Sequence, residues 1–234
     1  MDSDSYCVAG DPALMVVIRR HANARRISLR VSGADGRITL TMPPRAPLDQ
    51  AMAFADARAD WLRTAIASRP SRLRPIPGLA LPIEGVPHPI AAPPGRGPAR
   101  VEDGRLILPG PADSLAPRAA AFLRHLARDR LACACDRYAA AINRPFRAIA
   151  LRDTRARWGS CAADGTLRFN WRLAMAPPEV LDYVAAHEVA HLAQMNHSPA
   201  FWAVVGRISP GWQAQRDWLR AHGVSLQRWD FKGP

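Results

Sequence analysis

The segment at residues 187–191, with the sequence HEVAH, has the residue types and spacing of a metal-dependent hydrolase. On an α-helix, residues four positions apart lie on the same face, so His187 and His191 can bind one metal ion together. Neutral imidazole is a good ligand for Zn²⁺. Glu188 lies one step around the helix, where its carboxylate can take a proton from a metal-activated water. The segment therefore predicts a zinc site with Glu188 as catalytic base.

A third ligand is needed, because catalytic zinc usually has three protein ligands and one open position. His197 is the predicted third ligand. A continuous helix would turn it away from His191, so we expect the helix to end between them. We expect Asn196 to adopt the left-handed conformation common past helix ends, while Pro199 prevents simple continuation. Chance predicts on the order of 0.003 matches to the HExxH pattern in this chain, which favours a real site.

A second segment, RWGSC at Arg157–Cys161, precedes the motif and is predicted to be a strand that ends in a turn. Cys161 could be mistaken for a nucleophile, but hydrolysis by a metal-activated water needs none. Asn170 and Trp171 fall on the adjacent predicted strand, where they can line the cleft. The sequence assigns no role in the chemistry to the RWGSC segment.

The first half of the chain has β-rich patterns. Residues 1–13 are expected to be poorly ordered. Residues 14–43 contain runs typical of strands, and residues 48–68 have apolar side chains at helical spacing. Residues 70–112 are dense in proline and glycine, with short β-like pieces between them. We therefore predict a β-rich N-terminal module over residues 14–112, with one helix at 48–68.

The second half is predicted to combine helices with a few strands. The longest helical pattern covers residues 114–142, and strand patterns follow between residues 146 and 175. Two prolines set the start of the motif helix, predicted at 178–195. Two short helices are predicted at 199–208 and 211–222. These helices must position the histidines.

Composition limits the other function classes. The net charge is +12, but almost all of the positive charge is arginine spread along the chain, so a nucleic-acid partner has only weak support. No window of about 18 apolar residues occurs, so no membrane-spanning helix is predicted. The N-terminus lacks the basic start and apolar core of a secretory signal. We therefore expect a soluble cytoplasmic protein.

Three stretches together, RWGSC, LRFNWRL and YVAAHEVAHLAQMNHSPAFW, resemble the YgjP-like family of predicted metal-dependent hydrolases. That family is related to the SprT-like and WLM metallopeptidases within the zincin group. The resemblance is specific from Arg155 to Trp218. It implies that His187, His191 and His197 hold the metal, with Glu188 catalytic.

The resemblance also implies an α+β fold. The N-terminal β-rich module would be followed, over residues 113–234, by a zincin-like domain. That domain would contain a long helix, a small antiparallel sheet, the HExxH motif helix and C-terminal helices. The offset from His187 to His197 equals that of the metzincins, but Gln194 stands where that group has glycine. The turn is therefore expected to be built differently, at Asn196.

The leading hypothesis is zinc-dependent hydrolysis of a peptide or protein substrate. A first alternative is metal-dependent hydrolysis of a nucleoside triphosphate, because Arg152, Arg155 and Arg157 could hold phosphates near the site. A second alternative is a DNA-associated protein, either an SprT-like protease or a non-enzymatic nucleic-acid binder. Activated-water chemistry does not by itself choose between an amide and a phosphoanhydride.

Overall fold

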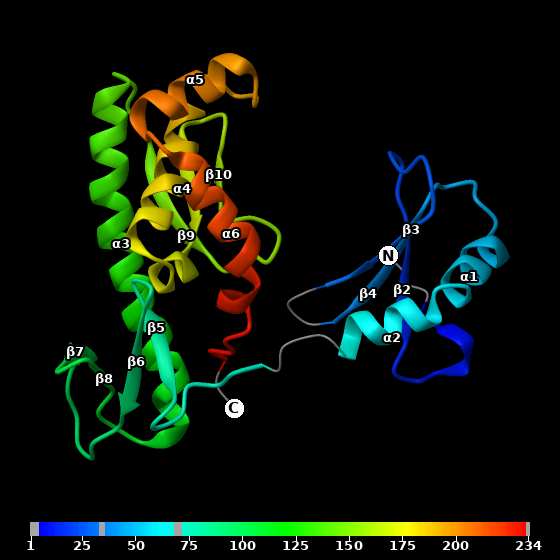
Figure 1. Cartoon of the computed structure of the whole chain (residues 1–234), viewed down its shortest axis with the longest axis horizontal. Helices are drawn as coiled ribbons and strands as arrows, with labels where there is room; N and C mark the ends of the chain where they lie inside the picture. The colour runs from blue at the N-terminus through cyan, green and yellow to red at the C-terminus, as the bar shows by residue number, and fades with distance from the viewer. Residues whose placement is uncertain (1–4, 33–35, 68–71, 233–234) are drawn as a thin grey trace. The chain divides into compact units, whose positions relative to one another are not determined.

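The computed structural model describes residues 5–32, 36–67 and 72–232. Two compact units divide the chain, Met1–Ser71 and Arg72–Pro234 (Figure 1). The boundary predicted between residues 112 and 113 is therefore corrected. The reason is packing: strands after residue 72 bury Leu81, Ile90 and Leu106 in the same hydrophobic core as the long helix that follows them.

The first unit is a four-stranded sheet with two helices. The strands pair in the order β1-β2-β4-β3, and β2 runs parallel to β4. Ile38, Leu40 and Met42 alternate with less buried residues and face the core, as the period of two in a strand requires. The elements are β1 (Ser5–Cys7), the 3-10 helix η1 (Val8–Gly10), β2 (Met15–Arg20), β3 (Ser28–Val31), β4 (Ile38–Met42), α1 (Leu48–Asp56) and α2 (Ala59–Ala67).

Two predictions for this unit are corrected. The segment 1–13 is not disordered where it is described, because β1 pairs with β2 and Val8 is fully buried; residues 1–4 lie outside the described residues. The helix predicted at 48–68 is two helices, since the Arg58 N–H donates to Ala55 O, three residues back, and interrupts the α-helical ladder. Residue 68 also lies outside the described residues.

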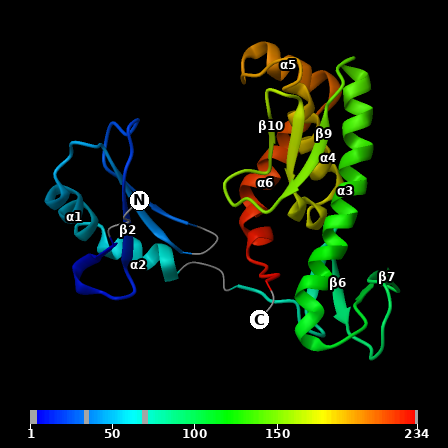
Figure 2. The same cartoon turned by 180° about the vertical axis from the view of Figure 1, so that it is seen from behind.

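The second unit carries two further sheets. Its first sheet, in the order β5-β6-β8-β7, precedes the long helix α3. Its second sheet, β10-β11-β9, precedes α4, α5 and α6 (Figure 2). The elements are β5 (Ala80–Ile83), β6 (Val86–Ala91), β7 (Arg100–Glu102), β8 (Arg105–Ile107), the 3-10 helix η2 (Ala112–Ser114), α3 (Leu115–Ala141), β9 (Ala148–Arg152), β10 (Gly159–Cys161), β11 (Thr166–Asn170), the 3-10 helix η3 (Trp171–Met175), α4 (Pro178–Ala190), α5 (Pro199–Ile208) and α6 (Trp212–Gln227).

The architecture is α+β, as predicted, with one difference in the sheet nearest the motif helix. That sheet is mixed rather than antiparallel: β10 and β11 are antiparallel, but β11 and β9 are parallel. The chain leaves β9 and passes to the far side of β11 before it forms β10. This path makes β10 an edge strand, which lies against α4.

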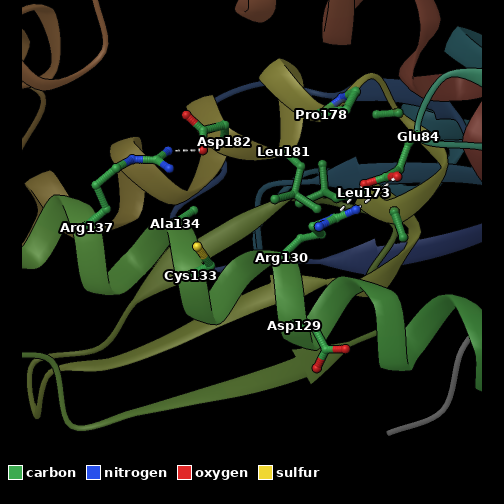
Figure 3. A pocket seen from close by; sticks show the side chains of 12 residues that line it. Glu84, Asp129, Arg130, Cys133, Ala134, Arg137, Leu173, Pro178, Leu181 and Asp182 are labelled. Atoms are coloured by element: carbon green, nitrogen blue, oxygen red, sulfur yellow. Dashed lines mark hydrogen bonds and ion pairs between the residues drawn. The ribbon is translucent and has the colours of Figure 1, made fainter.

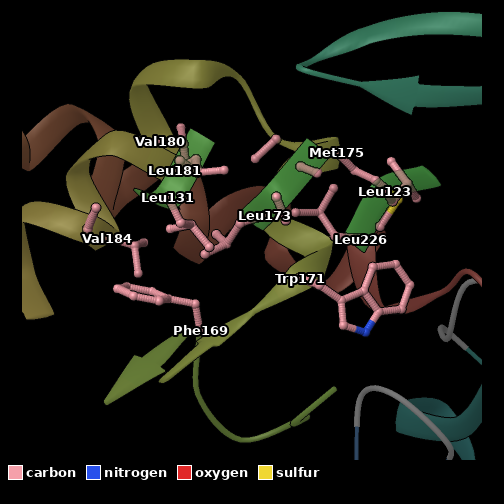
Figure 4. Close-up of a cluster of buried hydrophobic side chains, with 14 of the residues drawn as sticks. Leu123, Leu131, Phe169, Trp171, Leu173, Met175, Val180, Leu181, Val184 and Leu226 are labelled. Carbon is pink, nitrogen blue, oxygen red and sulfur yellow. The ribbon is translucent and has the colours of Figure 1, made fainter. Parts of the chain in front are cut away.

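The core of the second unit surrounds α4, the motif helix. Leu131 from α3, Phe169 from β11 and Val184 from α4 are among the buried side chains that meet there (Figure 4). Helix α4 is apolar around most of its circumference, which is typical of a buried helix. Among the described residues, the buried polar or charged side chains are Asn170, Arg172, Glu188 and His191. The motif therefore places polar groups where burial is costly.

No helix in the described part of the chain is long and apolar enough to cross a membrane.

Candidate metal centre

The end of α4 sets the direction of the third histidine. The helix stops at Ala190, five residues earlier than predicted, and one further turn closes when the Gln194 N–H donates to Ala190 O at 3.0 Å. Asn196 does not have the positive φ that we expected. Instead its side-chain oxygen accepts from the Ser198 N–H at 3.3 Å, and Ser198 caps α5. A side-chain turn therefore reverses the chain.

The three predicted ligands, His187, His191 and His197, converge. Their ligand atoms lie within 4.8 Å of one another, and the Nε2 atoms of His187 and His197 are 3.0 Å apart. The Nδ1 atom of His191 lies 3.0 Å from Gln194 O. A donor bond there leaves Nε2 with a free lone pair, the arrangement that metal-binding histidines use. The three imidazoles therefore form a group that could hold one metal ion.

The Phe201 side chain of α5 packs against all three imidazole rings. Phe201 is fully buried, and its ring centroid lies 4.9 Å from His187, 4.5 Å from His191 and 4.8 Å from His197. Burial lowers the pKa of His187 to about 4 and also lowers the pKa of His191. Both rings are therefore neutral at physiological pH, which is the form that binds metals.

Glu188 points toward β10. Its side chain is 5% exposed, and burial raises its pKa to about 8, against the opposing effects of Arg157 and of a hydrogen bond from the Cys161 N–H. A Cβ atom added at Gly159 would lie 2.4 Å from the Glu188 Oε1 atom. The Glu188 side chain therefore occupies the space that a side chain at position 159, in the RWGSC segment, would need. Sequence reasoning found this segment but not its contact with the motif.

Asn170 and Trp158 hold this loop against the sheet. Asn170 donates from its backbone N–H to Trp158 O at 2.8 Å and from its side chain to Thr154 O at 2.7 Å. A Cβ atom at Gly223 of α6 would lie 2.9 Å from the Trp158 ring, so the indole packs directly on that helix. Trp171, in contrast, does not line the cleft as predicted: it is 1% exposed and packs in the core.

Two cavities meet at Trp158 and Gly159. One, which we call the α6 cavity, has a volume of about 410 Å³ and includes His187 and Glu188. The other, the arginine cavity, has a volume of about 260 Å³. The α6 cavity is lined by Trp158, Gly159, Tyr183, Val184, His187, Glu188, Arg216, Leu219 and Arg220. The arginine cavity is lined by Arg152, Thr154, Arg157, Trp158, Gly159, Ser160, Arg168, Phe169 and Asn170.

The sequence analysis predicted only some of the residues that line these two cavities. Arg152 and Arg157 border the arginine cavity as expected, whereas Arg155 does not line it and Arg168 does. Arg216 and Arg220 were missed, although they border the α6 cavity. The spacing of Arg216 and Arg220 predicts that they share one face of α6, but it does not predict which part of the protein that face contacts.

The family model described as YgjP-like, metallopeptidase domain, matches residues 25–222. This chain belongs to the YgjP-like family. Among curated proteins, none matches the chain significantly. The crystal structure of the metallopeptidase zymogen of Pyrococcus abyssi abylysin is 24% identical in sequence, with a TM-score of 0.35; the alignment covers 41% of this chain and 92% of that one.

Membership in the YgjP-like family makes the protein a metallopeptidase-like hydrolase and implies a metal cofactor. Within the described ranges, the three-histidine cluster is the group of possible ligands found at metal-binding distance. The matched residues begin in the first unit and end in α6, so the family match extends over both compact units.

Proposed function

We propose that this YgjP-like protein is a zinc-dependent peptidase that uses His187, His191 and His197 as ligands and Glu188 as catalytic base. The observation that carries the proposal is the convergence of three imidazoles beside a buried carboxyl group. Three nitrogen ligands with an open position are typical of catalytic zinc. The zinc assignment rests on this donor set.

The residues divide the chemistry between them. When bound, zinc acidifies a coordinated water and favours the ionised form of a neighbouring carboxylate. Glu188 takes a proton from the attacking water and returns it to the leaving amine nitrogen as the C–N bond breaks. The Cys161 N–H and the charge of Arg157 both favour ionised Glu188, and Gly159 leaves the room its side chain needs.

A peptide substrate is supported by the position of β10. This strand lies at the edge of its sheet, and the Cys161 N–H donates to Glu188 rather than to a neighbouring strand. The outer edge of β10 therefore faces the catalytic carboxyl group. An extended peptide can pair with such an edge, and this would bring its backbone amides beside Glu188.

The proposal is tested with the zinc-loaded protein and its Glu188→Gln variant on an unfolded, casein-like substrate. Loss of a positioned base lowers the rate by about 10²- to 10⁴-fold. Bound zinc, measured by atomic absorption, should be unchanged because Glu188 is not a proposed ligand. A variant that keeps both zinc and full activity would show that Glu188 is not the base.

A second candidate function, hydrolysis of a nucleoside triphosphate, is favoured by the arginine cavity. Arg152, Arg157 and Arg168 border it without an acidic residue in its lining. Guanidinium groups bind phosphate oxygens well. Phosphate release from ATP by the zinc-loaded protein, lost in the Arg152→Gln/Arg168→Gln variant while casein cleavage persists, would support this function. Absence of phosphate release would exclude it.

A further inference from the structure

The α6 cavity combines apolar walls with two cationic groups. Val184, Leu219 and Trp158 supply apolar surface, while Arg216 and Arg220 come from α6. Because these arginines are four residues apart, they lie on one face of that helix. The cavity also contains His187 and Glu188, so whatever fills it lies beside the proposed reaction centre.

The Arg216 guanidinium packs on the ring of Trp212. Its guanidinium carbon lies 4.8 Å from the centre of the Trp212 ring, which stacks on Tyr183 at 6.3 Å. Tyr183 is one helical turn before His187 on α4, and their rings are 5.9 Å apart. A chain of ring contacts therefore connects Arg216 to a proposed metal ligand. A cation stacked on an indole ring loses less conformational freedom when it binds an anion.

The two guanidinium groups have only one acidic neighbour on α6. Asp217 lies 3.5 Å from Arg216 and 3.4 Å from Arg220, but its side chain is 61% exposed and it does not line the cavity. The contact of Asp217 with Arg216 is made to the buried Nε atom, which forms an ion pair there but no hydrogen bond to any described residue. The cavity lining itself therefore contains two guanidinium groups and one acidic residue, Glu188 of α4.

We propose that the α6 cavity binds a carboxylate group of the substrate next to the scissile bond, through Arg216 and Arg220. This inference rests on the proposed peptidase function and names its specificity. The carboxylate belongs either to an acidic side chain or to the C-terminus of the peptide. Paired N–H donors of a guanidinium match the two oxygens of a carboxylate.

The test uses the zinc-loaded full chain and a peptide library. Each position carries Glu in one set and Gln in the other, and each set is made with a free and with an amidated C-terminus. We expect the carboxylate form to raise kcat/KM about tenfold or more at one position, as for a charge-assisted hydrogen bond. Preference for Glu irrespective of amidation identifies a side chain as the source; preference for the free terminus identifies a carboxypeptidase.

Variants connect this preference to the cavity. Arg220→Gln is the first choice, because the Arg220 side chain is 70% exposed and its loss does not threaten folding. Arg216→Glu/Arg220→Glu should reverse the preference toward peptides that carry Lys. Arg128→Gln, an exposed position on α3, is the matched control and should keep the parental preference. A parental preference that survives in both cavity variants would overturn the proposal.

A binding measurement separates this proposal from the proposed function. Titration calorimetry of the zinc-loaded Glu188→Gln variant compares the Glu and Gln peptides. Tighter binding of Glu peptides, without cleavage by the parent protein, keeps the carboxylate site and rejects the peptidase. Cleavage without charge preference rejects the carboxylate site and keeps the peptidase. Absence of both binding and cleavage overturns both.

Discussion

Two cavities of similar size flank the motif helix. The α6 cavity contains the proposed site, and a second one, which we call the α3 cavity, has a volume of about 380 Å³ (Figure 3). Both are lined by apolar side chains together with arginines and acids. The α3 cavity is lined by Glu84, Asp129, Arg130, Cys133, Ala134, Arg137, Leu173, Ala174, Ala176, Pro178, Leu181 and Asp182.

The two cavities differ in how their charges are satisfied. In the α3 cavity, Arg130 donates to both carboxylate oxygens of Glu84, and Arg137 pairs with Asp182 (Figure 3). In the α6 cavity, the Nδ1 atom of His187 is buried without a hydrogen-bond partner among the described residues, and burial raises the pKa of Glu188 to about 8. Cavity volume therefore does not distinguish the proposed site from the α3 cavity, whereas polar groups held in costly environments do.

The largest effect that would test this difference is expected at Gly159. Gly159→Ala places a Cβ atom 2.4 Å from Glu188 Oε1, so the carboxyl group must move out of its position. We expect kcat/KM for peptide hydrolysis to fall by about 100-fold or more, because displacing a catalytic group by about 1 Å costs roughly this much. Steady-state kinetics of the zinc-loaded protein measure the loss.

The control for this change is Gly206→Ala in α5. A Cβ atom at Gly206 would lie 3.8 Å from the Trp212 ring nitrogen, an ordinary contact, and alanine is favoured in helices. It should leave the kinetics unchanged and stabilise the fold slightly. Equal activity of Gly159→Ala and the parent would show that the position of Glu188 against β10 is not needed.

A smaller effect is expected in the pH dependence of the metal-free protein. Glu188 holds its proton up to a pKa of about 8 in the folded chain, against an ordinary value of 4.5. The unfolded chain releases that proton first, so the free energy of unfolding falls as pH rises from 4.5 to 8. Below pH 6.5 the lowered pKa of His187 makes the free energy of unfolding rise with pH, which opposes the effect of Glu188. The effect of Glu188 is therefore measured in the window between pH 6.5 and 8.

Across that window we expect the metal-free parent to lose about 2 kcal/mol of unfolding free energy relative to Glu188→Gln, since each pH unit contributes about 1.4 kcal/mol. Urea unfolding in the presence of a chelator, at several pH values, measures both proteins. Because other titrating groups are shared, their contributions cancel in the difference. Parallel pH profiles for the two proteins would mean that Glu188 is ionised in the folded state.

The convergence of the proposed ligands was predictable from sequence because the helix fixes the geometry of His187 and His191. Residues 187 and 191 share a face at any position along a helix, and a chain reversal before His197 follows from Pro199. The structure confirms the α+β class and places α5 at the residues predicted for it. The turn does lie at Asn196, but the predicted left-handed backbone conformation was wrong. The Asn196 side chain reverses the chain by accepting a hydrogen bond, without a positive φ.

The contacts of Glu188 were not predictable, because they join segments far apart in the chain. From the sequence alone, Gly159 is interpreted as a turn residue and Arg216 as a solvent-exposed residue. The structure places Gly159 against Glu188 of α4 and Arg216 at the α6 cavity. The domain boundary was wrong for a related reason. The proline-rich strands β5 to β8 have a β-rich sequence like that of the sheet in the first unit, but they pack on α3 of the second unit. The periodicity of a strand does not show which element it packs against.

The smallest effect is expected on the other side of the motif helix. Arg130→Gln removes the ion pair with Glu84, whose oxygen lies 2.7 Å from the Arg130 Nε atom. The Arg130 side chain is 56% exposed, so solvent screens the pair and its loss should cost less than about 1 kcal/mol of unfolding free energy. Peptide hydrolysis and acidic preference should stay within about twofold of the parent, unlike the effect of Arg220→Gln in the α6 cavity. Steady-state kinetics on the Glu and Gln peptides and urea unfolding check both values. A tenfold loss of activity in Arg130→Gln would mean that paired charges also take part in the reaction, and the contrast between the two faces of α4 would not hold.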